Sequence, residues 1–178
     1  MKALKENPYR IFFLLGTIGL FVGLFVWIMT GFNEQLYFGR MHAHYMIGIF
    51  LLSFIIGFLM TAIPRMSGGK QASETELIVQ LLPMLSAAFW GVFEQDESYF
   101  FLSLIVAMLV MFRFSFSRIV KCPHVIPDVF PTVILGLLSG LAGAVLCYFD
   151  QSEIGGRLFY LNFVLLLCVG IGSKLIPM

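Results

Sequence analysis

Charged side chains are scarce in this sequence. Asp, Glu, Lys and Arg make up only 12% of its 178 residues, about half the proportion typical of soluble domains. Aromatic residues make up 16%, and the mean hydropathy is +0.95. A soluble chain of this length could not bury so much apolar surface, because a large part of any small domain stays exposed. The composition therefore excludes a soluble domain and predicts an integral membrane protein in contact with the lipid bilayer.

Basic tracts and cysteine pairs are also lacking. The net charge is +1 and no run of Lys or Arg occurs, so no nucleic-acid partner is expected. Cys122, Cys147 and Cys168 form neither a disulfide framework nor a CxxC metal pair. We interpret them as packing residues, since a buried thiol behaves as a small apolar group.

The sequence contains six apolar stretches. Each has close to the ~20 residues that a helix needs to cross hydrocarbon. They show no alternation with a period of two, which favours helices over membrane strands. The second stretch is long, so it is tilted or begins with an interfacial turn. We expect an all-α bundle of about six spans forming one membrane domain over residues 1–178. The predicted spans are 11–32, 37–64, 77–93, 99–117, 132–149 and 158–177.

Local signals mark helix ends and close contacts. Ser73 and Glu76 form a capping-box pattern ahead of the third span, and Asp128 is a predicted cap for the fifth. Gly19 and Gly23 form a GxxxG pair in the first span, which predicts close helix packing there.

Positive charge predicts the orientation. With six spans, nine of the 11 Lys and Arg residues fall on the side of the N-terminus, and only Arg40 and Arg157 fall on the other. Cytoplasmic segments carry the excess of Lys and Arg, so the N-terminus is expected in the cytoplasm. The acidic loop 94–97 then lies outside.

Ionisable residues are missing from the middle of the spans. No Asp, Glu or Arg lies deep in the predicted hydrocarbon segments, whereas ion-coupled transport usually depends on such a group. This pattern weighs against a coupled transporter.

Two of the only three histidines, His42 and His44, lie early in the second span, about 8–10 Å inside its outer boundary. Neutral imidazole is a common ligand of metals and of haem iron. In a regular helix the two side chains point ~200° apart, so they serve two centres, or share one if the helix begins between them. Gly48, one turn after His44, would leave a bare backbone patch for a flat macrocycle. The alternative is an interfacial pair that hydrogen-bonds to water, loops or lipid headgroups.

The third histidine, His124, follows Cys122 in a Cys-x-His pair. One such pair lacks the other ligands of a metal site, so a loop residue packed against helix ends is the simpler interpretation. Three histidines also exclude a complete haem–copper oxidase core, which needs about six histidine ligands.

Several segments resemble one family. Residues 40–46 read RMHAHYM and residues 55–64 read IIGFLMTAIP. They resemble the WHAHEM-like motif and the GFLLTAVPNW-like helix end of the NnrS family of bacterial membrane proteins. Residues 165–178, LLLCVGIGSKLIPM, are similar to that family's LLLxLGxGGRLLPM segment, and YRIFFL at 9–14 also fits.

The resemblance implies a function. NnrS-like proteins contain haem and copper, lie in the bacterial cytoplasmic (inner) membrane and are linked to nitric oxide and nitrosative stress. It implies that His42 and His44, at the family's HAH positions, bind haem and/or copper. Met41 stands in place of the family's Trp, and Tyr45 in place of its Glu, which removes any supporting role of that acid. Ser173 and Lys174 stand where Gly-Arg is common.

Length is a further departure from the family. Its members have roughly twice as many residues and spans. The chain is therefore expected to be a half-length relative, a fragment, or a partner in a homodimer or with other membrane subunits.

The leading hypothesis is a haem- or copper-binding membrane protein of nitric oxide handling, with enzymatic turnover left open. The alternatives are a small membrane transporter or metal-handling assembly factor without redox turnover, and a structural protein whose histidines are incidental.

Overall fold

A computed structural model describes residues 7–32, 39–92, 97–120 and 130–175, and within these ranges the chain is all-α with no strand. This confirms the expected fold class. The elements in chain order are α2 (Tyr9–Phe32), α3 (Gly39–Ala43), η1 (His44–Leu51), α4 (Leu52–Ser67), α5 (Glu74–Trp90), α6 (Ser98–Ile119), α7 (Phe130–Tyr148), α8 (Ser152–Gly156), η2 (Arg157–Asn162) and α9 (Phe163–Leu175). The two η elements are π-helical.

The six apolar stretches each coincide with a helical segment. α3, η1 and α4 form one continuous helix, as do α8, η2 and α9. Five segments of the described chain are long and apolar enough to cross a membrane: 9–32, 39–67, 98–119, 131–148 and 152–170. The sixth, α5, has 17 residues and begins with two acidic side chains, Glu74 and Glu76. The predicted start of the second span, the predicted ends of the third and sixth spans, and Asp128 lie outside the described residues.

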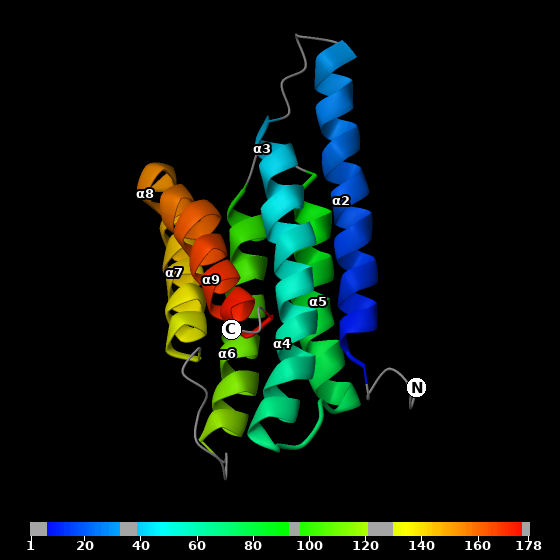
Figure 1. Cartoon of the computed structure of the whole chain (residues 1–178). Coiled ribbons are helices and arrows are strands. Elements are labelled where there is room, and N and C mark those ends of the chain that lie inside the picture. Colours follow the sequence, from blue (N-terminus) through cyan, green and yellow to red (C-terminus); the bar gives the residue numbers. More distant parts are fainter. Residues whose placement is uncertain (1–6, 33–38, 93–96, 121–129, 176–178) are drawn as a thin grey trace.

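The helices stand side by side in one bundle (Figure 1). α2 packs on η1 and α4, α4 packs on α6, and α6 contacts both α5 and α7, while α9 packs on α7. Large apolar side chains fill the space between them, including Phe12, Phe100, Phe159 and Phe163. Others, such as Phe21 and Leu82, point outward, as expected where lipid replaces protein as the apolar surroundings.

Gly19 and Gly23 allow α2 to approach η1 closely. A methyl group on Gly19 would lie 2.7 Å from Ile49 Cγ2, and one on Gly23 would lie 3.0 Å from Met46 Sδ. A larger residue would therefore push the helices apart. The close packing predicted from the GxxxG pair is confirmed.

The predicted capping box at the start of α5 is also confirmed. Ser73 Oγ accepts a hydrogen bond from the Glu76 N–H at 3.2 Å, and Glu76 Oε2 accepts one from the Ser73 N–H at 2.8 Å. Two N–H groups that the helix itself leaves without partners are satisfied in this way.

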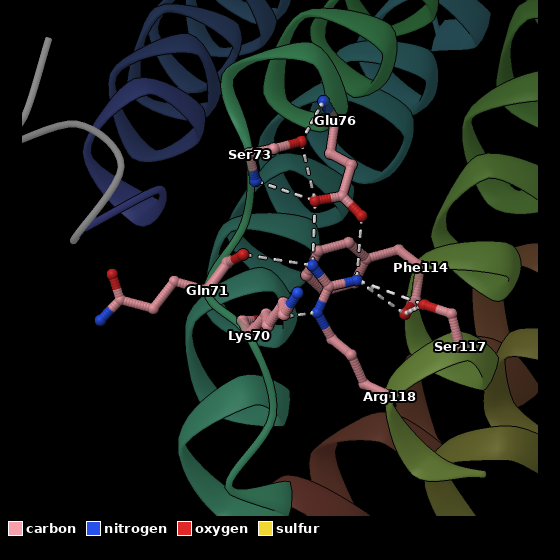
Figure 2. Close-up of polar contacts among 7 residues, drawn as sticks. All are labelled: Lys70, Gln71, Ser73, Glu76, Phe114, Ser117 and Arg118. Atoms are coloured by element: carbon pink, nitrogen blue, oxygen red, sulfur yellow. Dashed lines mark hydrogen bonds and ion pairs between the residues drawn. The ribbon is translucent and has the colours of Figure 1, made fainter. Parts of the chain in front are cut away.

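Arg118, one residue before the end of α6, extends this cap into a tertiary contact (Figure 2). Its two terminal nitrogens donate to Glu76 Oε1 and Oε2 at 3.0 and 2.9 Å, a bidentate pair. Its Nε donates to the Lys70 carbonyl at 2.9 Å, and the guanidinium lies 3.6 Å from the centre of the Phe114 ring. The side chain is only 8% exposed. Arg118 thus joins the α4–α5 connection, the start of α5 and the end of α6.

Replacing Arg118 with Leu should destabilise the bundle. The substitution removes the arginine donor from the Lys70 carbonyl and from the Glu76 carboxylate, which keeps only its contact with Ser73. Breaking a buried pair costs ~3–5 kcal/mol, and we expect about 2–3 kcal/mol here because the Glu76 side chain is 38% exposed and water can solvate it. Thermal or denaturant unfolding in detergent measures the loss. Arg113→Leu, an exposed arginine on the same helix, is the control, and an equal loss in both variants would contradict the assignment.

Candidate histidine site

His42 faces α2 from the end of α3. Its Nδ1 lies 2.9 Å from the Gly23 carbonyl oxygen. Because a carbonyl only accepts, Nδ1 carries the proton here, and in that neutral tautomer Nε2 holds the lone pair. The Trp27 ring lies against the imidazole with its centre 4.9 Å away.

His44 points toward α6, on another face of the same helix. It is 2% exposed and stacks on Phe100 with the ring centres 4.1 Å apart, while Phe101 packs edge to face with the ring centres 5.7 Å apart. Its Nε2 is 3.7 Å from Glu97 Oε2, which is within ion-pair distance but longer than a good hydrogen bond. Its Nδ1 is buried and has no hydrogen-bond partner among the described residues.

Glu97 precedes α6 and brings its carboxylate between two basic groups. It faces His44 on one side, and on the other it accepts a hydrogen bond from Arg40 at 3.0 Å. The pKa of the Glu97 carboxyl lies below its ordinary value, because the approach of His44, and then of Arg40, favours the anion more than burial disfavours it. The sequence placed Glu97 only in an acidic loop. Its contact with His44 depends on how the start of α6 lies against η1. The residues around Glu97 in the sequence do not reveal that arrangement.

A backbone change separates the two histidines. The helix is α-helical to Ala43 and π-helical from His44 to Leu51. Such wider turns are rare and often occur at functional sites. Since the chain is helical from Gly39 onward, the helix does not begin between the histidines. The alternative in which they share one ion is therefore not supported by this geometry.

The two histidines do not join a ready-made metal cluster. His42 contacts α2 and His44 contacts α6, so their rings lie on different faces. Across the part of the chain that the structure describes, no group of three or more His, Cys, Asp or Glu side chains is placed to hold a metal ion. Cys147 is buried and Cys168 exposed, both as free thiols. Cys122 and His124 lie outside the described residues.

Comparison with known families decides the relationship. The family model described as NnrS protein matches residues 3–178, nearly the whole chain. The chain belongs to the NnrS family. It is a multi-pass membrane protein of this nitric-oxide-response family. No curated protein and no solved structure matches it.

Tyr45 takes a structural role in this NnrS family member. It occupies the position where the family's motif has Glu, and its hydroxyl donates a hydrogen bond to the Ala88 carbonyl of α5. It therefore ties η1 to α5. The carboxylate beside His44 comes from Glu97 instead.

Gly48 does not leave an open patch, so that expectation is wrong. A methyl group on Gly48 would lie 2.5 Å from Phe100 Cζ and 3.4 Å from Leu104 Cδ1. The glycine thus makes room for the Phe100 ring, which also stacks on His44. The physical reason is that the bundle fills space beside a bare backbone with a side chain from the neighbouring helix.

Gly48→Ala should displace Phe100 and destabilise the histidine site. Overpacking of this kind costs about 1–3 kcal/mol, measured by thermal unfolding in detergent. Adding Phe100→Leu should recover part of the loss, because the two positions share one space. Gly31→Ala is the matched control, since a methyl group on Gly31 meets nothing within 4 Å. Equal effects at Gly31 and Gly48 would contradict this packing.

Proposed function

We propose that this NnrS family member binds haem or copper through His42 and His44 and acts in nitric oxide handling at the bacterial inner membrane. The observation that carries the proposal is the hydrogen bond from His42 Nδ1 to the Gly23 carbonyl. It leaves the lone pair on Nε2 in the neutral tautomer and holds the ring in one orientation. Metal-ligating histidines typically use this arrangement, donating the other ring N–H to a carbonyl or carboxylate.

His44 offers a second candidate ligand atom, in this case Nδ1 rather than Nε2. With Nε2 turned toward the Glu97 carboxylate, its Nδ1 keeps a lone pair that is buried without a partner among the described residues. An unpartnered buried polar atom costs about 1–3 kcal/mol, and coordination would offset that cost. His44 is only 2% exposed, so ligation through its Nδ1 requires neighbouring side chains to make room for the metal or haem.

The arrangement favours two separate ligand roles over a chelate. His42 and His44 face α2 and α6 respectively, so each would give one imidazole to its own centre. The remaining ligands would come from elsewhere, including the homodimer or other subunits predicted from the sequence. Haem iron or copper would supply the capacity to bind nitric oxide and to transfer single electrons. The protein residues orient the imidazoles, and the buried Phe100 and Phe101 rings exclude water around His44.

A reduced-minus-oxidised absorption spectrum with elemental analysis tests the proposal. The purified protein should show a haem Soret band or bound copper. His42→Ala should remove most of that signal, because its Nε2 is free for ligation, and His44→Ala should lower it. His124→Ala, the third histidine of the chain, is the matched control and should keep the wild-type spectrum.

A wild-type protein that holds neither haem nor copper would overturn the proposal. A transporter or metal-handling assembly factor would then be the better hypothesis, and uptake of copper by vesicles would be the next measurement.

A further inference from the structure

A cavity of about 780 Å³ lies where the α4–α5 connection meets the start of α5 and the last turns of α6. Residues 68–71 and Ser73 form one wall, and Val79, Val110 and Phe114 form apolar parts of the others. Arg118 and Glu76, the ion pair drawn in Figure 2, both line the cavity. The cavity therefore has both polar and apolar lining, and it uses neither His42 nor His44.

Gln80 lines this cavity and carries an acceptor without a partner among the described residues. The side chain is 0% exposed and lines the cavity. Its Nε2 donates to the Ala107 carbonyl at 3.0 Å, and because a carbonyl only accepts, the amide cannot be turned the other way round. Its Oε1 has no hydrogen-bond partner among the described residues. A buried acceptor of this kind calls for a donor, which an ordered water or a larger bound molecule can supply.

The charges of the cavity select for an anion. Arg118 is neutralised by Glu76, whereas Lys70 and Arg113 form no ion pair with any described carboxylate and are exposed. Gln80 lies four residues after Glu76 on α5, about 6 Å deeper along the helix. A ligand that matches both the two cations and the Gln80 acceptor has a negative group near Lys70 and Arg113. It also has a hydroxyl group near Gln80.

We propose that this cavity binds a glycerophosphate group, with the phosphate near Lys70 and Arg113 and a free hydroxyl donating to Gln80 Oε1. A headgroup that ends in an ammonium would also donate, but Lys70 and Arg113 disfavour a second cation. Inorganic phosphate would satisfy the cations and leave Gln80 without a donor. The same chemistry has two sources, the headgroup of phosphatidylglycerol and soluble glycerol 3-phosphate.

Lipid retention measured by native mass spectrometry from nanodiscs tests the hydroxyl contact. Phosphatidylglycerol is compared with phosphatidylmethanol, which has the same phosphodiester charge but no hydroxyl. The wild-type protein should retain phosphatidylglycerol about tenfold better, because a site built for a hydroxyl rejects an analogue that lacks it. Gln80→Leu should remove this preference. Equal retention of the two lipids by the wild-type protein would overturn the proposal without any variant, so a folding defect of Gln80→Leu leaves the test intact.

Charge variants test the phosphate contact. Arg113→Gln should weaken retention of both lipids about tenfold, the loss expected when one charge-assisted hydrogen bond is removed. Arg65→Gln is the matched control, because Arg65 is an exposed arginine on α4 that does not line the cavity. Equal losses in the two variants would show only general attraction to an anionic surface and would overturn the assignment.

Competition identifies the source of the ligand. If glycerol 3-phosphate displaces phosphatidylglycerol at millimolar concentration, the site takes the soluble molecule, and if it does not, the site takes the lipid headgroup. Either result keeps the glycerophosphate assignment. Displacement by inorganic phosphate as effective as that by glycerol 3-phosphate would overturn it, because Gln80 would then have no part in recognition.

Discussion

The contacts of the Arg118 guanidinium hold together the end of the bundle at which α4 connects to α5. A nearly buried cation is costly unless a carboxylate and further acceptors surround it, and here both oxygens of Glu76 and the Lys70 carbonyl do so. The arrangement constrains three segments at once: the α4–α5 connection, the first turn of α5 and the end of α6. Since Glu76 also completes the cap of Ser73, the start of α5 and the position of α6 are coupled. The proposed glycerophosphate cavity lies beside this pair.

In the histidine site, too, a carboxylate lies beside a buried basic side chain, but the contacts are weaker. Glu97, just before α6, brings a carboxylate to a buried basic side chain, His44, and shares it with the exposed Arg40. In both places an acidic residue at the start of a helix meets a basic side chain from a distant part of the sequence. The proposed metal chemistry needs this support, because an imidazole must be held in one orientation before its free nitrogen can serve as a ligand.

Much of the fold could be predicted because the signals are local. Long apolar runs predicted the helices, Ser73 and Glu76 predicted the cap of α5, and Gly19 and Gly23 predicted the close approach of α2. Gly48 shows the limit of such reasoning. A glycine one turn from His44 permits a close neighbour, but nothing nearby in the sequence says that this neighbour is the Phe100 ring. The ligand roles of His42 and His44 and the cytoplasmic N-terminus stay predictions.

The sequence by itself determined the class of protein, the number of helical segments and the histidines of interest, since hydropathy, capping and motif spacing act over a few residues. The tertiary structure decided what those residues face. His42 meets the Gly23 carbonyl 19 positions away, Gln80 meets that of Ala107 27 positions away, and Arg118 meets Glu76 42 positions away. Such pairings depend on the rotation and register of one helix against another, which side-chain packing across the whole bundle sets.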